Sequence, residues 1–315
     1  MRAIVVRAVG GPDALELVDV PVPVAGTGQV RIRVEAAAVN PVDAATRSGD
    51  LIAAGLMPPR DVIGTSIGIG WDVAGRIDEV GPGVTVFAPG DRVIGLRDRL
   101  DVPLGAYAEY LVLDAAAVAH APARLSPVEA ATLPLNGLTA LQSLDLLGLA
   151  PGATLLVTGA AGAVGGFAVE LAALRGIRVV ACAGPADEAF VRAAGAEWFV
   201  PRSAGLAAAV RELVPGGVDG ALDAAVAGIT ALGAVRNRGA FVSVVGGAAP
   251  TPLRGITVAE EWIAADGPAL AHLAALADTG RLTPRVADAL PLHRAGEAHR
   301  LLAEGGIRGR LVLVP

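Results

Sequence analysis

Alternation of apolar and polar positions in the first third of the chain predicts β-strands. Strand-like runs cover 1–7, 29–38, 72–80, 91–95 and 106–113. A period of two is typical of a strand with one buried face, and the Gly and Pro pairs at 81–83 and 89–90 mark turns between strands. Residues 1–122 are therefore predicted to form a β-rich domain.

The pattern changes at Ser126, where Ser-Pro-Val-Glu combines an N-cap residue, a proline at the first helical position and an acid in the first turn. Apolar strand-like runs then alternate with helix-like runs, at 154–158, 167–175, 177–182, 187–194, 197–200, 204–213, 218–222, 228–236 and 240–245. Such alternation predicts a parallel, doubly wound sheet with helices on both faces. The tail adds predicted helices at 268–280 and 297–304 and a closing strand at 310–314.

A glycine-rich loop is the clearest chemical signal in the chain. It follows an apolar strand, precedes a helix-like run, and consists of Gly159, Ala160, Ala161, Gly162, Ala163, Val164 and Gly165. Small residues at 159, 162 and 165 let the backbone turn tightly, approach a pyrophosphate and seat the helix on the sheet. A plain strand-to-helix turn is the alternative. The second strand at 178–182 supplies the βαβ context that favours nucleotide binding.

Composition excludes several classes of function. The 315 residues are 53% hydrophobic but only 3% aromatic, and all 25 basic residues are arginines. Without lysine there is no Schiff-base chemistry, and a net charge of −6 with scattered arginines predicts no nucleic-acid partner. The single cysteine, Cys182, excludes an internal disulfide and a thiolate metal cluster.

A mean hydropathy of +0.58 raises the possibility of a membrane protein. No apolar stretch reaches the length of a spanning helix, and residues 1–7 lack the apolar core of a signal peptide. We therefore expect a soluble, cytoplasmic protein with two domains and no membrane partner.

Several ordered motifs resemble those of the medium-chain dehydrogenase/reductase superfamily, specifically its zinc-independent quinone oxidoreductase branch. They lie at 38–43 with 47–49, 70–75 with 80–81 and 90–93, 105–110, 133–140, 159–165 and 308–313. The resemblance implies an α/β protein with a GroES-like β domain and a Rossmann domain. It places the first domain at 1–122 and 259–315, the second at 123–258, and the cofactor and substrate in the cleft between them.

The resemblance also implies chemistry without a metal. Gly70-Trp71-Asp72 stands where zinc-dependent members carry Gly-His-Glu, and Asn40 stands where their first ligand cysteine lies. The four histidines, at 120, 272, 293 and 299, lack ligand spacing and are interpreted as surface or packing residues. Hydride transfer from NADPH to an activated double bond or a quinone is the family chemistry that remains.

Asn40 and Asp43 are the candidate catalytic residues. The Asn40 amide can donate to the carbonyl oxygen that becomes negative during hydride addition, or orient the nicotinamide ribose. The alternative is a turn asparagine before Pro41 that contributes little to the core. Asp43 is a candidate to orient Arg47 or relay a proton, and a helix N-cap is the alternative.

Trp71 and Trp262 are candidate walls of the substrate pocket, with a core position as the alternative for each. Thr139 begins a helix that faces the nicotinamide in relatives, so it is a candidate cofactor contact, and helix capping is its alternative. Tyrosines common in relatives near positions 45 and 51 are absent. Their absence predicts a more apolar pocket and keeps open a second hypothesis, a cofactor-binding protein without turnover.

Cofactor choice depends on the end of the second Rossmann strand. Ala183 and Gly184 are neutral where an acid would accept the ribose hydroxyls of NAD, and Arg202 is the candidate partner of a 2′-phosphate. A solvated loop arginine is the alternative, and the acids at 187 and 188 oppose the assignment. We expect NADP(H). Val245 and Gly246, at the end of the run 240–245, complete the predicted cofactor contacts.

The expected partners are a small-molecule substrate and a second copy of the chain. The apolar run 240–245 is predicted to lie at an edge of the Rossmann sheet, where unpaired backbone groups would join two copies into a homodimer.

Overall fold

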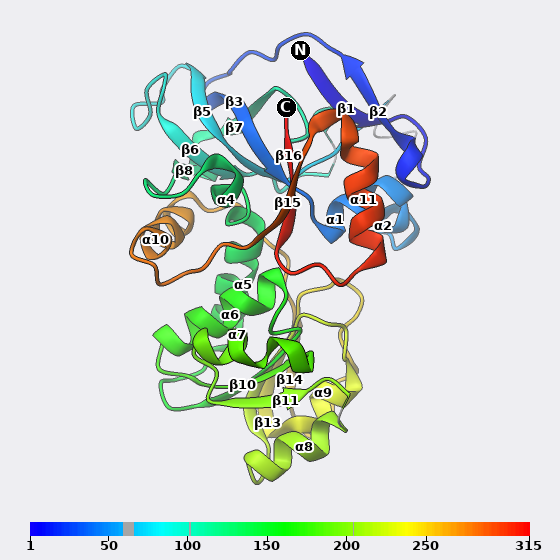
Figure 1. The fold of residues 1–315 in the computed structure, drawn as a ribbon, viewed down its shortest axis with the longest axis vertical. Helices are drawn as coiled ribbons and strands as arrows, with labels where there is room; N and C mark the ends of the chain where they lie inside the picture. The colour runs from blue at the N-terminus through cyan, green and yellow to red at the C-terminus, as the bar shows by residue number, and fades with distance from the viewer. Residues whose placement is uncertain (59–65, 101, 204) are drawn as a thin grey trace. The chain divides into compact units, whose positions relative to one another are not determined.

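The computed structural model describes residues 1–58, 66–100, 102–203 and 205–315, which form two compact units (Figure 1). Unit 1 comprises Met1–Leu138 and Ala264–Pro315, and unit 2 comprises Thr139–Ile263. The first division falls inside helix α5 (Pro134–Leu147). The predicted domain limits, 122/123 and 258/259, differ from this division and stay a prediction.

Unit 1 is built on two β-sheets. The larger has the order β15-β16-β3-β5-β6-β8, with β7 also paired to β3, and the smaller has the order β2-β1-β4. The strands of the larger sheet are β3 (Gln29–Ala38), β5 (Asp72–Val80), β6 (Arg92–Leu96), β7 (Tyr110–Asp114), β8 (Val118–His120), β15 (Val286–Pro291) and β16 (Arg310–Val314). Those of the smaller are β1 (Arg2–Val6), β2 (Leu15–Asp19) and β4 (Ile67–Gly68). The tail thus completes the sheet begun by the first third of the chain.

Most of the predicted strands of unit 1 are confirmed, with one late start. The run predicted from 106 becomes β7 only at Tyr110. The reason is that the Ala106 and Tyr107 N–H groups donate to the carbonyl oxygens of Gly70 and Ile69, which lie outside the ladder with β3. This detour carries the Tyr107 side chain into the core of unit 1, where it is fully buried.

The helices of unit 1 are α1 (Pro41–Ser48), α2 (Asp50–Ala53), α4 (Pro127–Ala130), α10 (Gly267–Asp278) and α11 (Ala295–Glu304). Three of them, α1, α4 and α10, begin with an Asn, Ser or Asp N-cap and a proline in the first turn. The predicted start at Ser126 is confirmed, since Ser126 and Glu129 form a capping box. Helix α4 is only four residues long, and α5 begins at Pro134, because a residue that precedes proline disfavours the helical conformation.

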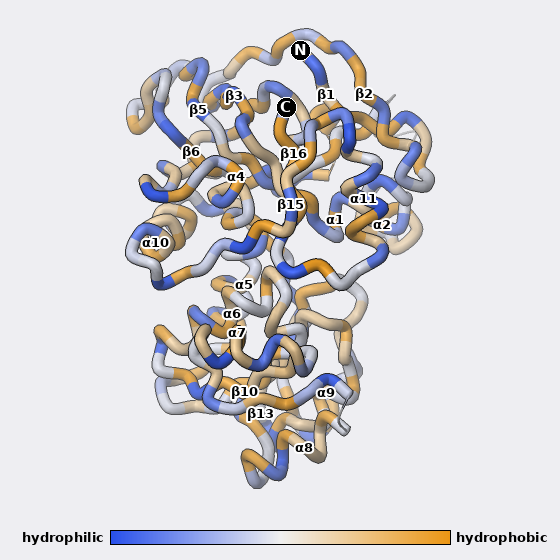
Figure 2. The backbone as a smooth tube through the Cα atoms, viewed as in Figure 1, coloured by the Kyte–Doolittle hydropathy of each residue, from blue (hydrophilic) through white to orange (hydrophobic). Residues whose placement is uncertain are grey.

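Unit 2 is a parallel sheet with the strand order β11-β10-β9-β12-β13-β14. Its strands are β9 (Thr154–Thr158), β10 (Arg178–Ala183), β11 (Trp198–Pro201), β12 (Val218–Asp223), β13 (Val235–Ser243) and β14 (Thr257–Glu260). Its helices are α6 (Ala163–Leu174), α7 (Glu188–Ala193), α8 (Leu206–Leu213) and α9 (Ile229–Ala234). Strands buried in such a sheet are apolar runs, and all five residues of β9 are buried. Figure 2 shows the backbone of both units coloured by hydropathy. The α/β class, with a GroES-like domain and a Rossmann-like parallel sheet, is confirmed.

The prediction that 240–245 forms a sheet edge is wrong. Strand β13 pairs with β12 on one side and with β14 on the other, so β14 is the edge strand. Strand β14 has only four residues, with Thr257 and Glu260 at its ends, so its sequence does not predict a strand. The homodimer stays a prediction, without this strand as its basis.

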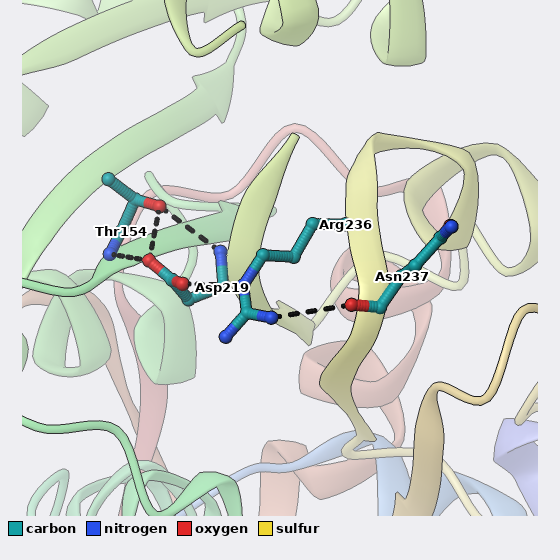
Figure 3. Close-up of polar contacts among 4 residues, drawn as sticks. All are labelled: Thr154, Asp219, Arg236 and Asn237. Carbon is teal, nitrogen blue, oxygen red and sulfur yellow. Dashed lines mark hydrogen bonds and ion pairs between the residues drawn. The ribbon is translucent and has the colours of Figure 1, made fainter. Parts of the chain in front are cut away.

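A polar cluster joins three strands at the amino edge of the sheet in unit 2 (Figure 3). One carboxylate oxygen of Asp219 accepts bonds of 2.8 Å from the Thr154 backbone N–H and hydroxyl, and the other accepts a 2.7 Å bond from Arg236 Nε. The cluster ties β9, β12 and β13 together at their amino ends. It lies at the opposite edge from the glycine loop, since that loop follows the carboxyl end of β9.

Among the described residues, no helix is both long and apolar enough to cross a lipid bilayer.

Candidate functional site

The glycine loop of unit 2 is shaped by close backbone contacts. Gly159 has φ +59°, and a Cβ there would lie 2.9 Å from the Ala224 carbonyl oxygen. A Cβ on Gly165 would overlap the Gly159 carbonyl group. Neither position therefore accepts a side chain, because other atoms of the chain already occupy the space that a Cβ would fill. Such a bare backbone cradle fits a dinucleotide pyrophosphate.

Helix α6 begins at Ala163, four residues earlier than predicted, with the exposed Gly162 as its N-cap. Glycine has a low helix propensity, yet Gly165 and Gly166 lie within the first turn of α6, where Gly165 packs on Gly159. The first-turn N–H groups of α6 therefore lie at the loop itself. Ala160, Ala161, Ala163 and Val164 surround this helix end, which is the usual place for a bound phosphate.

The carboxyl end of β10 carries the residues predicted to select the cofactor. Ala183 is buried, and its carbonyl oxygen accepts a 2.9 Å bond from the Arg202 N–H. A Cβ on Gly184 would lie 3.9 Å from the Arg202 guanidinium carbon and 3.0 Å from the Asp187 carboxylate. The structure thus places both the Arg202 guanidinium and the Asp187 carboxylate close to Gly184.

The carboxyl end of β13 leads into Val245 and Gly246. Val245 is 42% exposed, and the Trp262 ring covers Gly246 so closely that a Cβ there would lie 2.6 Å from it. Trp262 is itself 59% exposed, so a core position is excluded for it, whereas Trp71 is buried in unit 1. Thr139 lies in the second turn of α5 and does not begin that helix, so the capping alternative is wrong.

In unit 1, Asn40 is fully buried and forms the N-cap of α1. Its amide nitrogen donates to Asp72 Oδ2 over 2.6 Å and, more weakly, to the Ala38 carbonyl oxygen over 3.4 Å. Its amide oxygen accepts a 3.3 Å bond from Asn136. The expectation that this asparagine contributes little to the core is therefore wrong.

Asp43 is not the N-cap of α1. It is the third residue of the helix, and its carboxylate forms a capping box with the N-cap residue Asn40. Its carboxylate accepts bonds from the backbone N–H groups of Asn40 (2.8 Å) and Gly70 (3.1 Å) and from the Tyr107 hydroxyl (3.1 Å). Burial raises the pKa of Asp43 to about 6 in spite of these donors. Asp43 does not bond Arg47, whose Nε and Nη1 lack a hydrogen-bond partner within the described chain.

Asp72 is the centre of this polar network, and sequence analysis gave it no role. Its Oδ1 accepts a 2.6 Å bond from the Leu135 N–H, while Oδ2 accepts the bond from Asn40. Burial, with a smaller contribution from the nearby Asp43, raises the pKa of Asp72 to about 7. Arg310 opposes that shift and donates 2.5 and 3.0 Å bonds to Asn136 Oδ1. The sequence offered one signal for this role, because Asp72 is an acid that directly precedes the apolar residues at the start of β5.

His299 is a packing residue, as predicted. It is fully buried, its ring lies edge-on to Tyr107 with centroids 5.9 Å apart, and burial lowers its pKa to about 3. Among the described residues, no three His, Cys, Asp or Glu side chains are grouped so as to hold a metal ion.

Comparison with known families matches both parts of the chain. An alcohol dehydrogenase GroES-like domain matches residues 26–123, and a zinc-binding dehydrogenase domain matches residues 185–313. A chloroplast envelope quinone oxidoreductase homolog from Arabidopsis thaliana is 38% identical over 194 residues, 60% of this chain and 56% of that protein. Erythronolide synthase EryA2 from Saccharopolyspora erythraea is 40% identical over 169 residues, 53% of this chain but 4% of that protein. The matches thus span about half the Arabidopsis protein.

Solved structures match over the full chain. An NAD-dependent alcohol dehydrogenase is 33% identical with a TM-score of 0.88, and each chain is covered completely. The quinone oxidoreductase from Coxiella burnetii is 30% identical with a TM-score of 0.88, over 100% of this chain and 99% of that one. Mycobacterial Rv1454c complexed with NADPH is 30% identical with a TM-score of 0.82 and complete coverage of both chains.

Proposed function

This chain belongs to the medium-chain dehydrogenase/reductase superfamily, in its quinone oxidoreductase branch, and on that premise we propose that it is an NADPH-dependent, zinc-independent oxidoreductase acting on an activated C=C bond or a quinone. The observation that carries the proposal is the backbone cradle at Gly159 and Gly165, where no Cβ fits. The cradle and the start of α6 would hold the pyrophosphate. Relatives named as quinone oxidoreductases support the substrate class.

Bound NADPH supplies the hydride in this chemistry. The chain's task is to stabilise the negative charge that develops on the substrate oxygen and to manage one proton. Asn40 is the proposed donor to that oxygen, because one of its amide hydrogens has only the long 3.4 Å contact to Ala38. Asp43 is the proposed proton-holding group, since its pKa of about 6 leaves a fraction protonated near neutral pH.

Consumption of NADPH with a panel of quinones, enones and enoyl thioesters tests the proposal. Turnover of at least one class, with reduction of its C=C bond or quinone, is the expected result. The similarity to part of erythronolide synthase is the reason for including enoyl thioesters. NADPH binding without consumption across the panel would instead favour the second hypothesis, a cofactor-binding protein without turnover.

We propose Arg202 as the residue that favours NADPH over NADH. Replacing Arg202 with alanine is expected to weaken NADPH binding by about 1–3 kcal/mol, a lost charged hydrogen bond, while NADH binding changes little. Isothermal titration of both cofactors measures the two values. Arg178→Ala, at the exposed start of the neighbouring strand β10, is the matched control and should leave both unchanged.

Two observations argue against a preference for NADPH. One similar structure is an NAD-dependent alcohol dehydrogenase, and the Asp187 carboxylate lies beside Gly184. Equal or tighter binding of NADH by the unchanged protein would contradict the assignment of Arg202.

We also propose that the protein works without zinc. Asn40 stands at the place of a ligand cysteine, and its amide is engaged with Asp72 and Asn136. Elemental analysis of the purified protein is expected to find no stoichiometric zinc, and a chelator should leave activity and melting temperature unchanged. One tightly held zinc per chain would contradict this prediction. A homodimer acting on a small molecule, with no nucleic-acid partner, completes the proposal.

A further inference from the structure

One loop of unit 2 holds a valine in an unfavourable backbone conformation. Val226, between β12 and α9, has φ +54°, in the left-handed region that β-branched residues rarely adopt. Its side chain is nevertheless 57% exposed, so apolar burial within this chain does not compensate for the conformation. Outliers of this kind persist where the surrounding structure enforces them, and they concentrate at functional sites.

The enforcing group is Asp223, the fully buried last residue of β12. Its Oδ1 accepts bonds from the backbone N–H groups of Ala225 (3.2 Å) and Ala227 (3.0 Å), and its Oδ2 accepts a 2.7 Å bond from the Gly228 N–H. One carboxylate thus fixes three backbone N–H groups around Val226. The N–H groups in turn supply hydrogen bonds to a buried side chain that would be costly to leave without partners.

The same carboxylate joins this loop to the glycine loop. The Thr158 hydroxyl, at the end of β9, donates a 2.5 Å bond to Asp223 Oδ1. Beside it, a Cβ on Gly159 would lie 2.9 Å from the Ala224 carbonyl oxygen and 3.2 Å from the Ala225 Cβ. The two loops are therefore in direct contact, and neither can shift without disturbing the other.

The carboxyl edge of the sheet also exposes other apolar side chains. Val245 follows β13 and is 42% exposed, and Trp262 follows β14 and is 59% exposed. Because the strands are parallel, their carboxyl ends lie at one edge, and this edge is where ligands bind in open α/β sheets. An exposed apolar side chain held beside a phosphate cradle has a natural partner in the flat rings of a dinucleotide.

We propose that Asp223 is a positioning residue that holds loop 224–228 against the glycine loop, so that the strained Val226 side chain forms an apolar wall of the dinucleotide site. The inference rests on the proposed binding of NADPH and adds a residue to that site. The strain is then a cost to stability that is recovered in cofactor binding.

The Val226→Gly variant separates the cost of backbone strain from the contact with the cofactor. Glycine tolerates the left-handed conformation, and its lack of a side chain removes the apolar wall. The variant is expected to melt about 2 °C higher than the unchanged protein and to bind NADPH about fivefold more weakly. Arg238→Gly is the matched control, since Arg238 has φ +59° and is exposed but lies before Ala240, toward the amino end of β13. The Arg238→Gly variant should have a higher melting temperature than the unchanged protein and the same affinity for NADPH.

Asp223→Asn and Thr158→Val test the positioning role. Each keeps the side-chain shape and removes acceptor or donor capacity, so the KM for NADPH should rise about tenfold for Asp223→Asn and less for Thr158→Val, with kcat changed far less. Thr158→Val keeps the test decisive if Asp223→Asn does not fold.

An unchanged NADPH affinity in Val226→Gly, or an unchanged KM in the folded positioning variants, would overturn this inference alone. Failure of the unchanged protein to bind either NADPH or NADH would overturn both the inference and the proposed function.

Discussion

Replacing Asn40 with alanine is expected to lower turnover on the order of a hundredfold, the effect of losing one donor to a developing oxyanion. It should also lower the free energy of unfolding by about 2–4 kcal/mol, because Asp72 and the Asn136 amide would each lose a buried hydrogen-bond partner. Steady-state kinetics with the best substrate of the panel and chemical denaturation measure the two effects.

Asn136→Ala is the control for that variant. It removes a neighbour in the same network, the donor to Asn40 Oδ1 and the acceptor from Arg310, without touching the proposed donor hydrogen. A comparable loss of stability with a much smaller loss of turnover is expected. Full activity of Asn40→Ala, or equal losses of turnover in the two variants, would leave Asn40 a structural residue only. A ribose-orienting role would appear as a raised KM for NADPH with a smaller loss of rate.

The Asp72→Asn variant is expected to gain stability relative to the unchanged protein as the pH rises from 4 to 7. Folding raises the pKa of Asp72 from 3.8 to about 7, so in this range the folded chain keeps a proton that the unfolded chain releases. The contribution of Asp72 is therefore most favourable below about pH 4 and is lost as the pH rises through the folded pKa. Asparagine does not titrate, so the stability difference should grow by on the order of 3 kcal/mol across the range.

Chemical denaturation at a series of pH values measures that difference. The comparison isolates Asp72 from Asp43, whose raised pKa acts in the same sense, and from His299. Burial lowers the His299 pKa, so its contribution is lost as the pH falls below about 6.5. Asp19→Asn, at an exposed position of β2, is the control. A stability difference for Asp72→Asn that stays constant with pH would show that folding does not raise the pKa of Asp72.

Local features of the fold were predictable because their causes are local. Strand and helix periods follow from which side chains of one segment face the core, and they located β3, β5, β9 and β16 to the residue. The capping box at Ser126 and the left-handed turn at Gly159 depend on residues within a few positions of each other. The glycine loop could therefore be proposed as a nucleotide site from its sequence context.

Strand order and side-chain environment were not predictable in the same way. The sequence of the run at 240–245 did not predict that the short strand β14 would pair with it, since pairing depends on residues brought from elsewhere in the chain. Trp262 and Trp71 look alike in the sequence, yet one is 59% exposed and the other 6%. Burial is a property of the packed units, not of the residue type.

By itself, the sequence determined the α/β class and the superfamily, and it predicted the glycine loop and the candidate positions Asn40 and Asp43. Only the tertiary structure decided how those residues are bonded: Asn136 and Arg310, which share a hydrogen bond in the Asp72 network, lie 174 positions apart. The carboxylates of Asp72 and Asp223 appeared in the sequence as acids at the ends of apolar runs. Their roles emerged only when folding removed them from water, because a buried polar group must find its hydrogen-bond partners wherever the fold brings them.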